Sequence, residues 1–450
     1  MEKKEILKKI EESGHCKIKF AVSDIDGVLR GKILNIKKFS EVADKSIGFC
    51  DVIFGWDIND KCYDNSKLTG WHTGYPDQQV RIDLDTYRTI PWDNDLPYFL
   101  GDFSIPGKEV PACPRNLLKK IAHSCHEMGF KAMFAQEFEW FNFMGTPDQL
   151  AADRYSNLKT LSPGMFGYSQ LRPALNPDYI NELFDLLEKF NIPLESLHPE
   201  TGPGVYEASI LYDEVISAAD KAILFKESVR EIAYRHRIMA SFMAKWNENL
   251  PGCSGHLHQS LWSRDGKQNI FHPEAGQQMS PVLENYLAGL LFCLPEVLPM
   301  YAPTINSYKR LRSGSWAPAT VTWGKENRTT AVRYIPGEEK ATRLEMRVPG
   351  SDSNPYLAMA ASLASGLYGI KNNLRLTVPG IAGNAYERKD ITQLPPDLAA
   401  ATLKMKNSTI AGELFGEAFV DHFTRTREWE CREYAKAVTD WELSRYFELV

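Results

Sequence analysis

Residues 341–348 read Ala-Thr-Arg-Leu-Glu-Met-Arg-Val, and this stretch decides how the rest of the chain is interpreted. In a strand, alternate side chains share a face, so Arg343, Glu345 and Arg347 would lie together opposite a mostly apolar face. Further arginines precede the stretch, and a guanidinium fork suits the recognition of phosphate or carboxylate. The alternative is a solvated salt-bridge ladder on a sheet surface, because exposed ion pairs are common and contribute little to stability.

Length and composition are those of an ordinary globular protein. The chain has 450 residues, of which 43% are hydrophobic and 24% are charged. Its net charge of −6 does not favour binding to nucleic acid or to an anionic membrane. No apolar run approaches the ~20 residues that a membrane helix needs. The eight cysteines are scattered without a Cys-x-x-Cys pair, which predicts free thiols in a reducing compartment, the cytoplasm.

The periodicity of the chain changes after residue 107. Residues 17–39 alternate around an Asp26-Gly27 turn, which predicts a β-hairpin within a small β-rich domain over residues 1–107. Residues 108–450 mix helical and strand patterns, which predicts a large α+β domain with a mainly antiparallel sheet. The expected helices cover residues 115–129, 177–190, 217–237, 285–294, 356–370 and the tail 411–450. The expected strands cover residues 131–143, 241–245, 256–262 and parts of 329–348.

Two motifs bring carboxylates together. Glu137 and Glu139 are two residues apart in an aromatic run, so on a strand they would share a face and repel unless a cation lies between them. An exposed strand face is the alternative. His198-Pro-Glu200 is followed by a Gly/Pro turn and Glu207, and this turn could direct the two carboxylates toward one point, although alone it indicates only a loop.

A third motif supplies imidazoles. His256 and His258 share a strand face after a loop of small residues, although such a pair is also common in purely structural positions. Together with Glu345, the motifs offer five glutamates and one or two histidines, which favour more than one Mg²⁺ or Mn²⁺ ion over zinc. Hard metals beside an arginine cluster indicate phosphoryl transfer. The chain has neither a Walker A nor a Rossmann glycine motif, so another fold would hold the nucleotide.

The order of these motifs resembles that of the glutamine synthetase superfamily over nearly the whole chain. The matching motifs are Glu-x-Glu, Glu-x₆-Glu across Gly-Pro-Gly, Gly-x-x-x-His-x-His-x-x-Ser, Asn-Ser-Tyr-Lys-Arg, Asn-Arg-x₄-Arg, Arg-x-Glu-x-Arg and Asn-Pro-Tyr-Leu. The resemblance implies a β-grasp-like N-terminal domain, a curved catalytic sheet, and activation of glutamate by ATP as γ-glutamyl phosphate before an amine attacks. It also implies two or three Mg²⁺ or Mn²⁺ ions per site, and rings of identical subunits, as a dodecamer, with shared active sites.

The resemblance also implies a role for each matching residue. The implied metal ligands are Glu139, Glu200 and Glu207 for one ion, and Glu137, His256 and Glu345 for the other. The implied glutamate-binding residues are Arg310 and Arg347, with Gly252 beside them. The implied nucleotide- and phosphate-handling residues are His258, Ser260, Arg333, Lys340 and Arg343, with Arg328 in a catalytic role.

Three departures from the family pattern concern the amine and the loop before His256. Trp316 stands where members that use ammonia carry a glutamate; tryptophan cannot accept a proton, but it can pack against an organic amine. The Asp-Gly-Ser-Ser segment is absent, and Asp57 is the candidate for deprotonating the amine of a neighbouring subunit's site. Cys253 and Ser254 stand where Ser-Gly is typical.

These departures lead to a hypothesis of an ATP-dependent ligase that joins glutamate to an organic amine, with Trp316 as part of the amine site. Glutamine synthesis from ammonia is the alternative within the same class. A non-catalytic structural relative is the alternative of another class, although the intact carboxylate set argues against it because buried carboxylates are costly without a cation. Without the resemblance, the residues indicate metal-dependent phosphoryl transfer, with a metal-dependent hydrolase as the competing interpretation.

Overall fold

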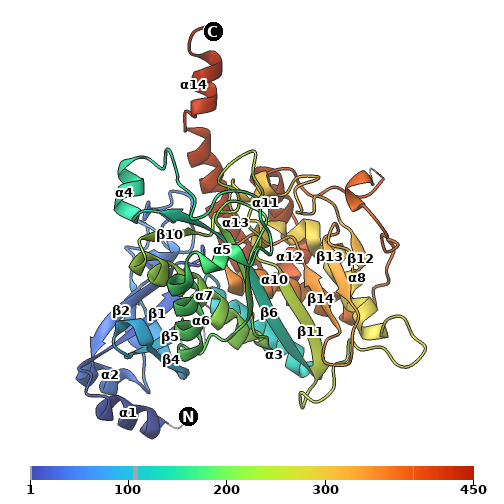
Figure 1. The fold of residues 1–450 in the computed structure, drawn as a ribbon. Coiled ribbons are helices and arrows are strands. Elements are labelled where there is room, and N and C mark those ends of the chain that lie inside the picture. Colours follow the sequence, from blue (N-terminus) through green and yellow to red (C-terminus); the bar gives the residue numbers. More distant parts are fainter. Residues whose placement is uncertain (1–2, 105–109, 389) are drawn as a thin grey trace.

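The computed structural model describes residues 3–104, 110–388 and 390–450. The fold contains two sheets, one in the N-terminal part of the chain and one in the rest, and helices pack around them (Figure 1). The expected boundary between residues 107 and 108 lies outside the described residues and stays a prediction. All eight cysteines are free, as expected from their spacing.

The N-terminal sheet has five strands in the order β2-β1-β5-β4-β3. These strands are β1 (Lys17–Ser23), β2 (Leu29–Asn35), β3 (Ile47–Cys50), β4 (Asp77–Ile90) and β5 (Leu96–Phe103). The predicted hairpin is confirmed, because β1 and β2 pair around Gly27, whose φ of +82° favours glycine. Two helices, α1 (Lys3–Glu12) and α2 (Ile36–Val42), bury Ile6 and Phe39 in the apolar core of this sheet.

The second sheet has nine strands and is curved and mainly antiparallel, as expected. Its strands are β6 (Phe130–Met144), β7 (Leu194–Pro199), β8 (Val205–Ile210), β9 (Asp213–Glu214), β10 (Ile238–Ser241), β11 (Leu257–Ser263), β12 (Trp323–Lys325), β13 (Val332–Ile335) and β14 (Arg343–Met346). The long strand β6 pairs with β8, β9, β10 and β11 and therefore forms the centre of the sheet.

The strand expected over residues 241–245 is wrong in its position. The strand in this region is β10, which ends at Ser241 opposite Phe141 of β6. It cannot continue along this edge of β6, because the backbone N–H of Glu139 is bonded to the carbonyl oxygen of Ser254 at 2.9 Å. A later loop therefore occupies the edge that a longer β10 would need.

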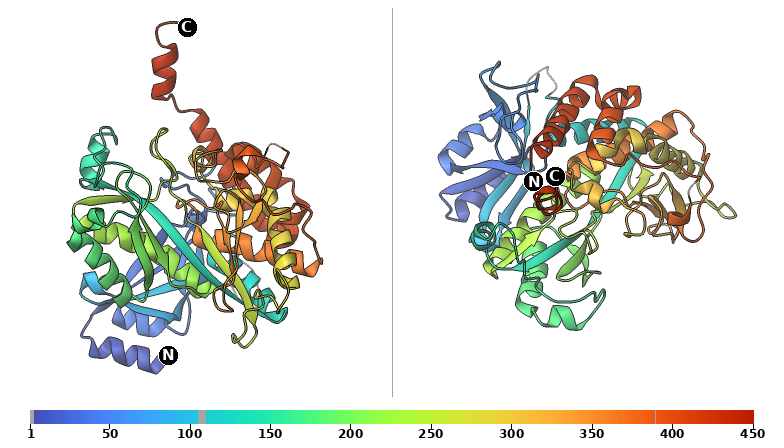
Figure 2. Two further views of the ribbon diagram at one scale, coloured as in Figure 1. Left: turned by 45° about the vertical axis from the view of Figure 1, so that its right-hand side comes forward. Right: turned by 90° about the horizontal axis from the view of Figure 1, so that it is seen from above.

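Helices pack around the second sheet and continue to the C-terminus (Figure 2). These helices are α3 (Pro114–Glu127), α4 (Pro147–Ala152), α5 (Leu171–Ala174), α6 (Pro177–Lys189), α7 (Val215–Arg235), α8 (Pro281–Tyr301), α9 (Ser307–Arg310), α10 (Pro355–Lys371), α11 (Leu398–Lys406), α12 (Thr409–Phe415), α13 (Glu417–Ala435) and α14 (Asp440–Tyr446). Three 3₁₀ turns complete the described elements: η1 (Asp51–Phe54), η2 (Pro91–Asp93) and η3 (Ala385–Glu387). The last helix, α14, extends away from the body of the protein in Figure 1 and in the left view of Figure 2.

Helix α8 corrects two expectations. It was expected to end at Leu294, before a proline, but it continues through Pro295 and Pro299 because burial against α10 outweighs the local cost of each proline. Its 21 residues are long and apolar enough to cross a membrane, which contradicts the expectation of no such run. However, 67% of its most apolar window is buried inside the protein, as in a core helix.

A buried guanidinium joins the N-terminal sheet to the helices. Arg115 on α3 bonds Asp102 on β5 and Asp220 on α7, each at 2.8 Å, and Asp83 on β4 at 2.9 Å. Burial disfavours the charged arginine, but the charges of Asp220 and Asp102 outweigh this effect and raise the pKa of Arg115 well above its ordinary value. The three carboxylates therefore depend on Arg115 for their charge balance.

Replacing this arginine tests whether the buried network stabilises the fold. We expect Arg115→Met to lower the free energy of unfolding by about 3–5 kcal/mol, because it leaves buried carboxylates without their main partner. The control Lys371→Met removes an exposed pair with Glu413 and should leave stability unchanged. Urea unfolding at equal protein concentration measures both variants, and equal midpoints would contradict this account.

Candidate active site

The register of three adjacent strands brings the first group of site residues together. Glu139 of β6 pairs with Glu207 of β8, which pairs in turn with His198 of β7. Cross-strand neighbours lie on the same face of a sheet, so the three side chains converge. Nε2 of His198 lies 3.4 Å from a carboxylate oxygen of Glu200 and 3.6 Å from one of Glu207.

A second group forms where β11 lies between β6 and β14. His258 of β11 is the cross-strand partner of Glu345, and its Nε2 lies 3.1 Å from Oε1 of Glu137. Nδ1 of His256 lies 3.3 Å from Oε1 of Glu345 and 3.7 Å from Oε2 of Glu137. The sheet therefore gathers two imidazoles and two carboxylates around one point.

All six expected metal ligands lie in these two groups, but the tightest sets differ from those expected. His198, Glu200 and Glu207 have ligand atoms within 4.8 Å of one another, as do Glu137, His258 and Glu345. His198 was not assigned a role from the sequence, although it opens the His-Pro-Glu motif. Its ring stacks on Tyr168 with centroids 4.4 Å apart, a contact between distant parts of the chain that the sequence pattern does not reveal.

The electrostatics of the first group favour a bound cation. Burial and the charges of Glu139, Glu137 and Glu200 raise the pKa of Glu207 to about 10. In the second group, Nε2 of His256 is buried and has no hydrogen-bond partner within the described ranges. Carboxylate oxygens that repel one another, with imidazole nitrogens beside them, are a donor set that fits a divalent cation such as Mg²⁺ or Mn²⁺.

Glu345 has the opposite environment. It is 1% exposed and accepts hydrogen bonds from Arg347 and from Arg333, whose Nη1 lies 3.1 Å away. Burial alone would raise the pKa of Glu345, but the charges of Arg347, His256 and His258 hold it below its ordinary value. This burial contradicts the alternative of a solvated ladder on a sheet surface.

The loop before β11 packs against the residues expected to bind glutamate. Arg310 is buried and donates hydrogen bonds to the carbonyl oxygens of Val348 and Arg347, at 2.9 and 3.1 Å. A Cβ atom on Gly252 would lie 2.4 Å from the carbonyl oxygen of Ala244 and 3.0 Å from Cγ of Arg310. Only glycine therefore fits where this loop passes the arginine.

Tyr386 is a further residue at this point that sequence reasoning missed. The charges of Arg347 and Arg310 act on its phenol, which places its ring near both guanidiniums, although burial has the larger effect and raises its pKa. Its hydroxyl is buried without a hydrogen-bond partner in the described part of the chain. Tyr386 lies in η3, and no motif in the sequence singles it out.

Four of the residues expected to handle nucleotide and phosphate line one cavity of about 270 Å³: His258, Ser260, Lys340 and Arg343. Nε of Arg343 donates to Nδ1 of His258 at 3.0 Å, which orients the imidazole toward Glu137. The fifth, Arg333, lies beside Glu345 instead. Arg328 is exposed, and its charge acts on the nearby phenol of Tyr168.

One expected site residue, Asp57, is not brought to the two carboxylate groups of its own chain. Its Oδ1 accepts from the backbone N–H groups of Asn59 and Lys61, at 2.9 and 3.0 Å. Its Oδ2 accepts from the indole N–H of Trp429 on α13 at 2.9 Å. Within its own chain, Asp57 therefore closes its loop and attaches that loop to α13.

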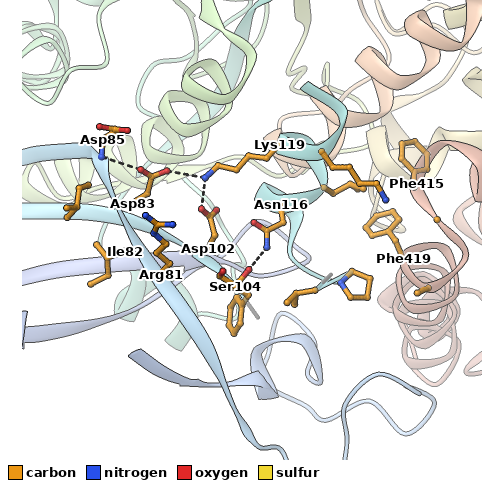
Figure 3. A pocket seen from close by; sticks show the side chains of 18 of the residues that line it. Arg81, Ile82, Asp83, Asp85, Asp102, Ser104, Asn116, Lys119, Phe415 and Phe419 are labelled. Carbon is orange, nitrogen blue, oxygen red and sulfur yellow. Dashed lines mark hydrogen bonds and ion pairs between the residues drawn. The ribbon is translucent and has the colours of Figure 1, made fainter. Parts of the chain in front are cut away.

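A larger cavity of about 580 Å³ lies between the N-terminal sheet and helices α3, α12 and α13 (Figure 3). Lys119 pairs there with Asp102 at 2.5 Å and with Asp83 at 3.1 Å, while Phe415 and Phe419 form an apolar side. None of the expected site residues is among its described lining residues. Cavity size alone therefore does not locate the chemistry in this protein.

Most of the chain is similar to a known protein family. Residues 111–446 match the model of the glutamine synthetase catalytic domain. The protein is an ATP-dependent carbon–nitrogen ligase, as relatives named ligases and synthetases also indicate. The chain belongs to the glutamine synthetase family.

The names of individual relatives differ in the product or the amine that they state. The chain is 51% identical to the type-1 glutamine synthetase 2 of Dictyostelium discoideum, covering 99% of this chain and 86% of that protein. It is 37% identical to the glutamate–isopropylamine ligase of a Pseudomonas species, covering 100% and 99%. The solved structure of a GmaS/ADP complex superposes with a TM-score of 0.85 at 26% identity, covering 98% of this chain and 99% of the other.

Glu345→Ala tests the second group. We expect kcat to fall below about a tenth of the wild-type value, a loss of more than ~1.4 kcal/mol, because the change removes the carboxylate between Arg347 and Arg333. The matched control is Glu326→Ala, which removes the other, more exposed partner of Arg333 and should leave kcat nearly unchanged. Phosphate release from ATP measures both; a Glu345→Ala enzyme above that limit contradicts the role of Glu345.

Proposed function

We propose that this protein joins the side-chain carboxylate of glutamate to an organic amine, forming a γ-glutamyl amide through γ-glutamyl phosphate. The observation that carries the proposal is Trp316, which stands where the family resemblance places a glutamate in members that use ammonia. The tryptophan is 61% exposed and adopts φ +60°, an uncommon conformation for a residue that is not glycine. Similarity to the glutamate–isopropylamine ligase over the full chain supports the same amine class.

The place of Trp316 in the chain, six residues after Arg310, supports a role at the amine site. It lies on the loop after α9, and α9 ends at Arg310, which we assign to glutamate binding together with Arg347 and Gly252. An indole ring offers an apolar face and a π-system that attracts an ammonium group. We therefore infer that Trp316 packs against the organic part of the amine. Because it stands in place of a glutamate, the site also lacks the carboxylate that would favour free ammonium.

We assign the cation ligands to the two groups described above. Glu139, Glu200 and Glu207 with His198 would hold one cation, and Glu137, His256 and Glu345 the other, with two or three Mg²⁺ or Mn²⁺ ions per site. When bound, these ions would neutralise phosphate oxygens and the carboxylates that repel one another. The protein's own contribution is to hold the carboxylates at fixed positions on β6, β8 and β14.

The cationic side chains would divide the substrates between them. ATP is assigned to the cavity lined by His258, Ser260, Lys340 and Arg343. Arg333 and Arg328 would contact the transferred phosphoryl group, where guanidinium groups stabilise the charge that develops during transfer. In this proposal the acid would bind between the phosphate-handling side chains and the Gly252 loop.

Deprotonation of the amine requires a second subunit in this proposal. The Asp57 carboxylate is bonded within its own chain to its loop and to Trp429, away from that chain's carboxylate cluster. We therefore assign proton acceptance to Asp57 supplied to a neighbouring subunit's site. The family resemblance makes a ring, as a dodecamer, the expected assembly with active sites between subunits.

Glutamine synthesis from ammonia is the second candidate function. The type-1 glutamine synthetase 2 of Dictyostelium discoideum is 51% identical to this chain, a higher identity than that of the glutamate–isopropylamine ligase. The two candidates share the activation of glutamate and differ only in the nucleophile. The nucleophile that the amine site accepts therefore distinguishes the two functions.

An amine panel tests the proposed function directly. Phosphate release is measured with ATP and glutamate and, in turn, ammonium, alkylamines, polyamines and aromatic amines. We expect an organic amine to give the highest kcat/KM, because Trp316 favours an apolar amine over ammonium. Release with millimolar ammonium as fast as with any organic amine would instead establish glutamine synthesis.

Trp316→Glu tests the residue that carries the proposal. We expect the ratio of ammonia use to organic amine use to rise by at least about tenfold, ~1.4 kcal/mol, because a carboxylate can accept the proton of ammonium. The control Trp316→Phe keeps an aromatic wall and should leave this ratio close to that of the wild type. An unchanged ratio in Trp316→Glu would remove the basis for assigning an organic amine.

A further inference from the structure

One residue, Ser254, holds both oxygens of the Glu139 carboxylate. The backbone N–H of Ser254 donates to Oε2 of Glu139 at 2.9 Å, and its hydroxyl donates to Oε1. The carbonyl oxygen of Ser254 also accepts from the backbone N–H of Glu139 at 2.9 Å. Ser254 therefore fixes both the backbone and the carboxylate of this residue.

The surrounding turn holds Ser254 in place. Its carbonyl oxygen lies 2.6 Å from the hydroxyl of Ser351, which is also 2.5 Å from the carbonyl oxygen of Glu139. The next residue, Gly255, donates its backbone N–H to the carbonyl oxygen of Pro349 at 3.0 Å. Ser254 and Ser351 are both buried, so water does not compete strongly for these bonds.

The bonds to Ser254 restrict where Glu139 can bind a cation. A carboxylate has about four lone-pair sites, and Ser254 occupies one on each oxygen. Glu207 is the cross-strand neighbour of Glu139, and the Glu139 charge is, after burial, the largest cause of the raised pKa of Glu207. The remaining lone pairs of Glu139 are thus held beside a second carboxylate, where a cation would bind both.

We propose that Ser254 is a positioning residue for the cation site, in which its hydroxyl and backbone N–H lock the Glu139 carboxylate beside Glu207. This inference rests on the proposed function, since it requires the carboxylate cluster to bind a divalent cation. Without the hydroxyl, Oε1 of Glu139 loses its fixed partner, and the carboxylate can rotate away from Glu207. A cation would then have to order this carboxylate when it binds, which lowers its affinity.

Mn²⁺ binding to the full-length protein, measured calorimetrically without nucleotide or glutamate, tests this role. We expect Ser254→Ala to weaken the binding of one Mn²⁺ per chain by about 10–100-fold, as for other residues that orient metal ligands. Ser254→Gly removes the same hydroxyl with a smaller side chain and should give the same loss. The matched control is Ser353→Ala in the adjoining turn, whose buried hydroxyl donates to the carbonyl oxygen of Gly350 at 2.8 Å.

The control variant separates a loss of Glu139 positioning from a general loss of stability. We expect Ser353→Ala to bind Mn²⁺ within about twofold of the wild type, even if its thermal stability falls as much as that of Ser254→Ala. Wild-type Mn²⁺ affinity in folded Ser254→Ala or Ser254→Gly would overturn the inference and leave the proposed function intact. No Mn²⁺ binding by the wild type would overturn the proposed cation site itself, and the inference with it.

Discussion

Repulsion between carboxylates on one face of the central sheet is the constraint on which the site depends. Glu137 and Glu139 project from β6, and β8 adds Glu207 as a cross-strand neighbour of Glu139. In water these charges would repel only weakly, but here they are half-buried and close together. The strands therefore hold together a set of like charges, whose repulsion is relieved by a proton or by a cationic partner.

The two groups of site residues differ in how the charge of their carboxylates is compensated. Glu345 is neutralised by the protein, since Arg347 and Arg333 bond its two oxygens and its pKa is lowered. Glu207 faces other carboxylates instead, and its pKa is raised to about 10. An imidazole, His198, lies 3.6 Å from Glu207 but does not reverse this effect. The first group is thus the part of the site with the greatest need for a cation from solution.

The sequence predicted the parts of this site that depend on local periodicity. The spacing of Glu137 and Glu139, and of Arg343 and Glu345, indicates shared strand faces without knowledge of the fold. The contacts of His198 with Tyr168 and of Ser254 with Glu139 join residues far apart in the chain, so no local pattern encodes them. The strand expected over residues 241–245 was misplaced for the same reason, because the end of β10 depends on which loop occupies the edge of β6.

The central claim is that the arginine and carboxylate groups activate an acid by phosphoryl transfer, before any amine reacts. Glutamate labelled with ¹⁸O in its side-chain carboxylate tests this claim, with mass spectrometry of the phosphate released during amide formation. Our account predicts one ¹⁸O atom in each phosphate, because the carboxylate oxygen that attacks ATP leaves with the phosphoryl group. Phosphate without ¹⁸O would show that water, and not the acid, attacks ATP, and would contradict the account.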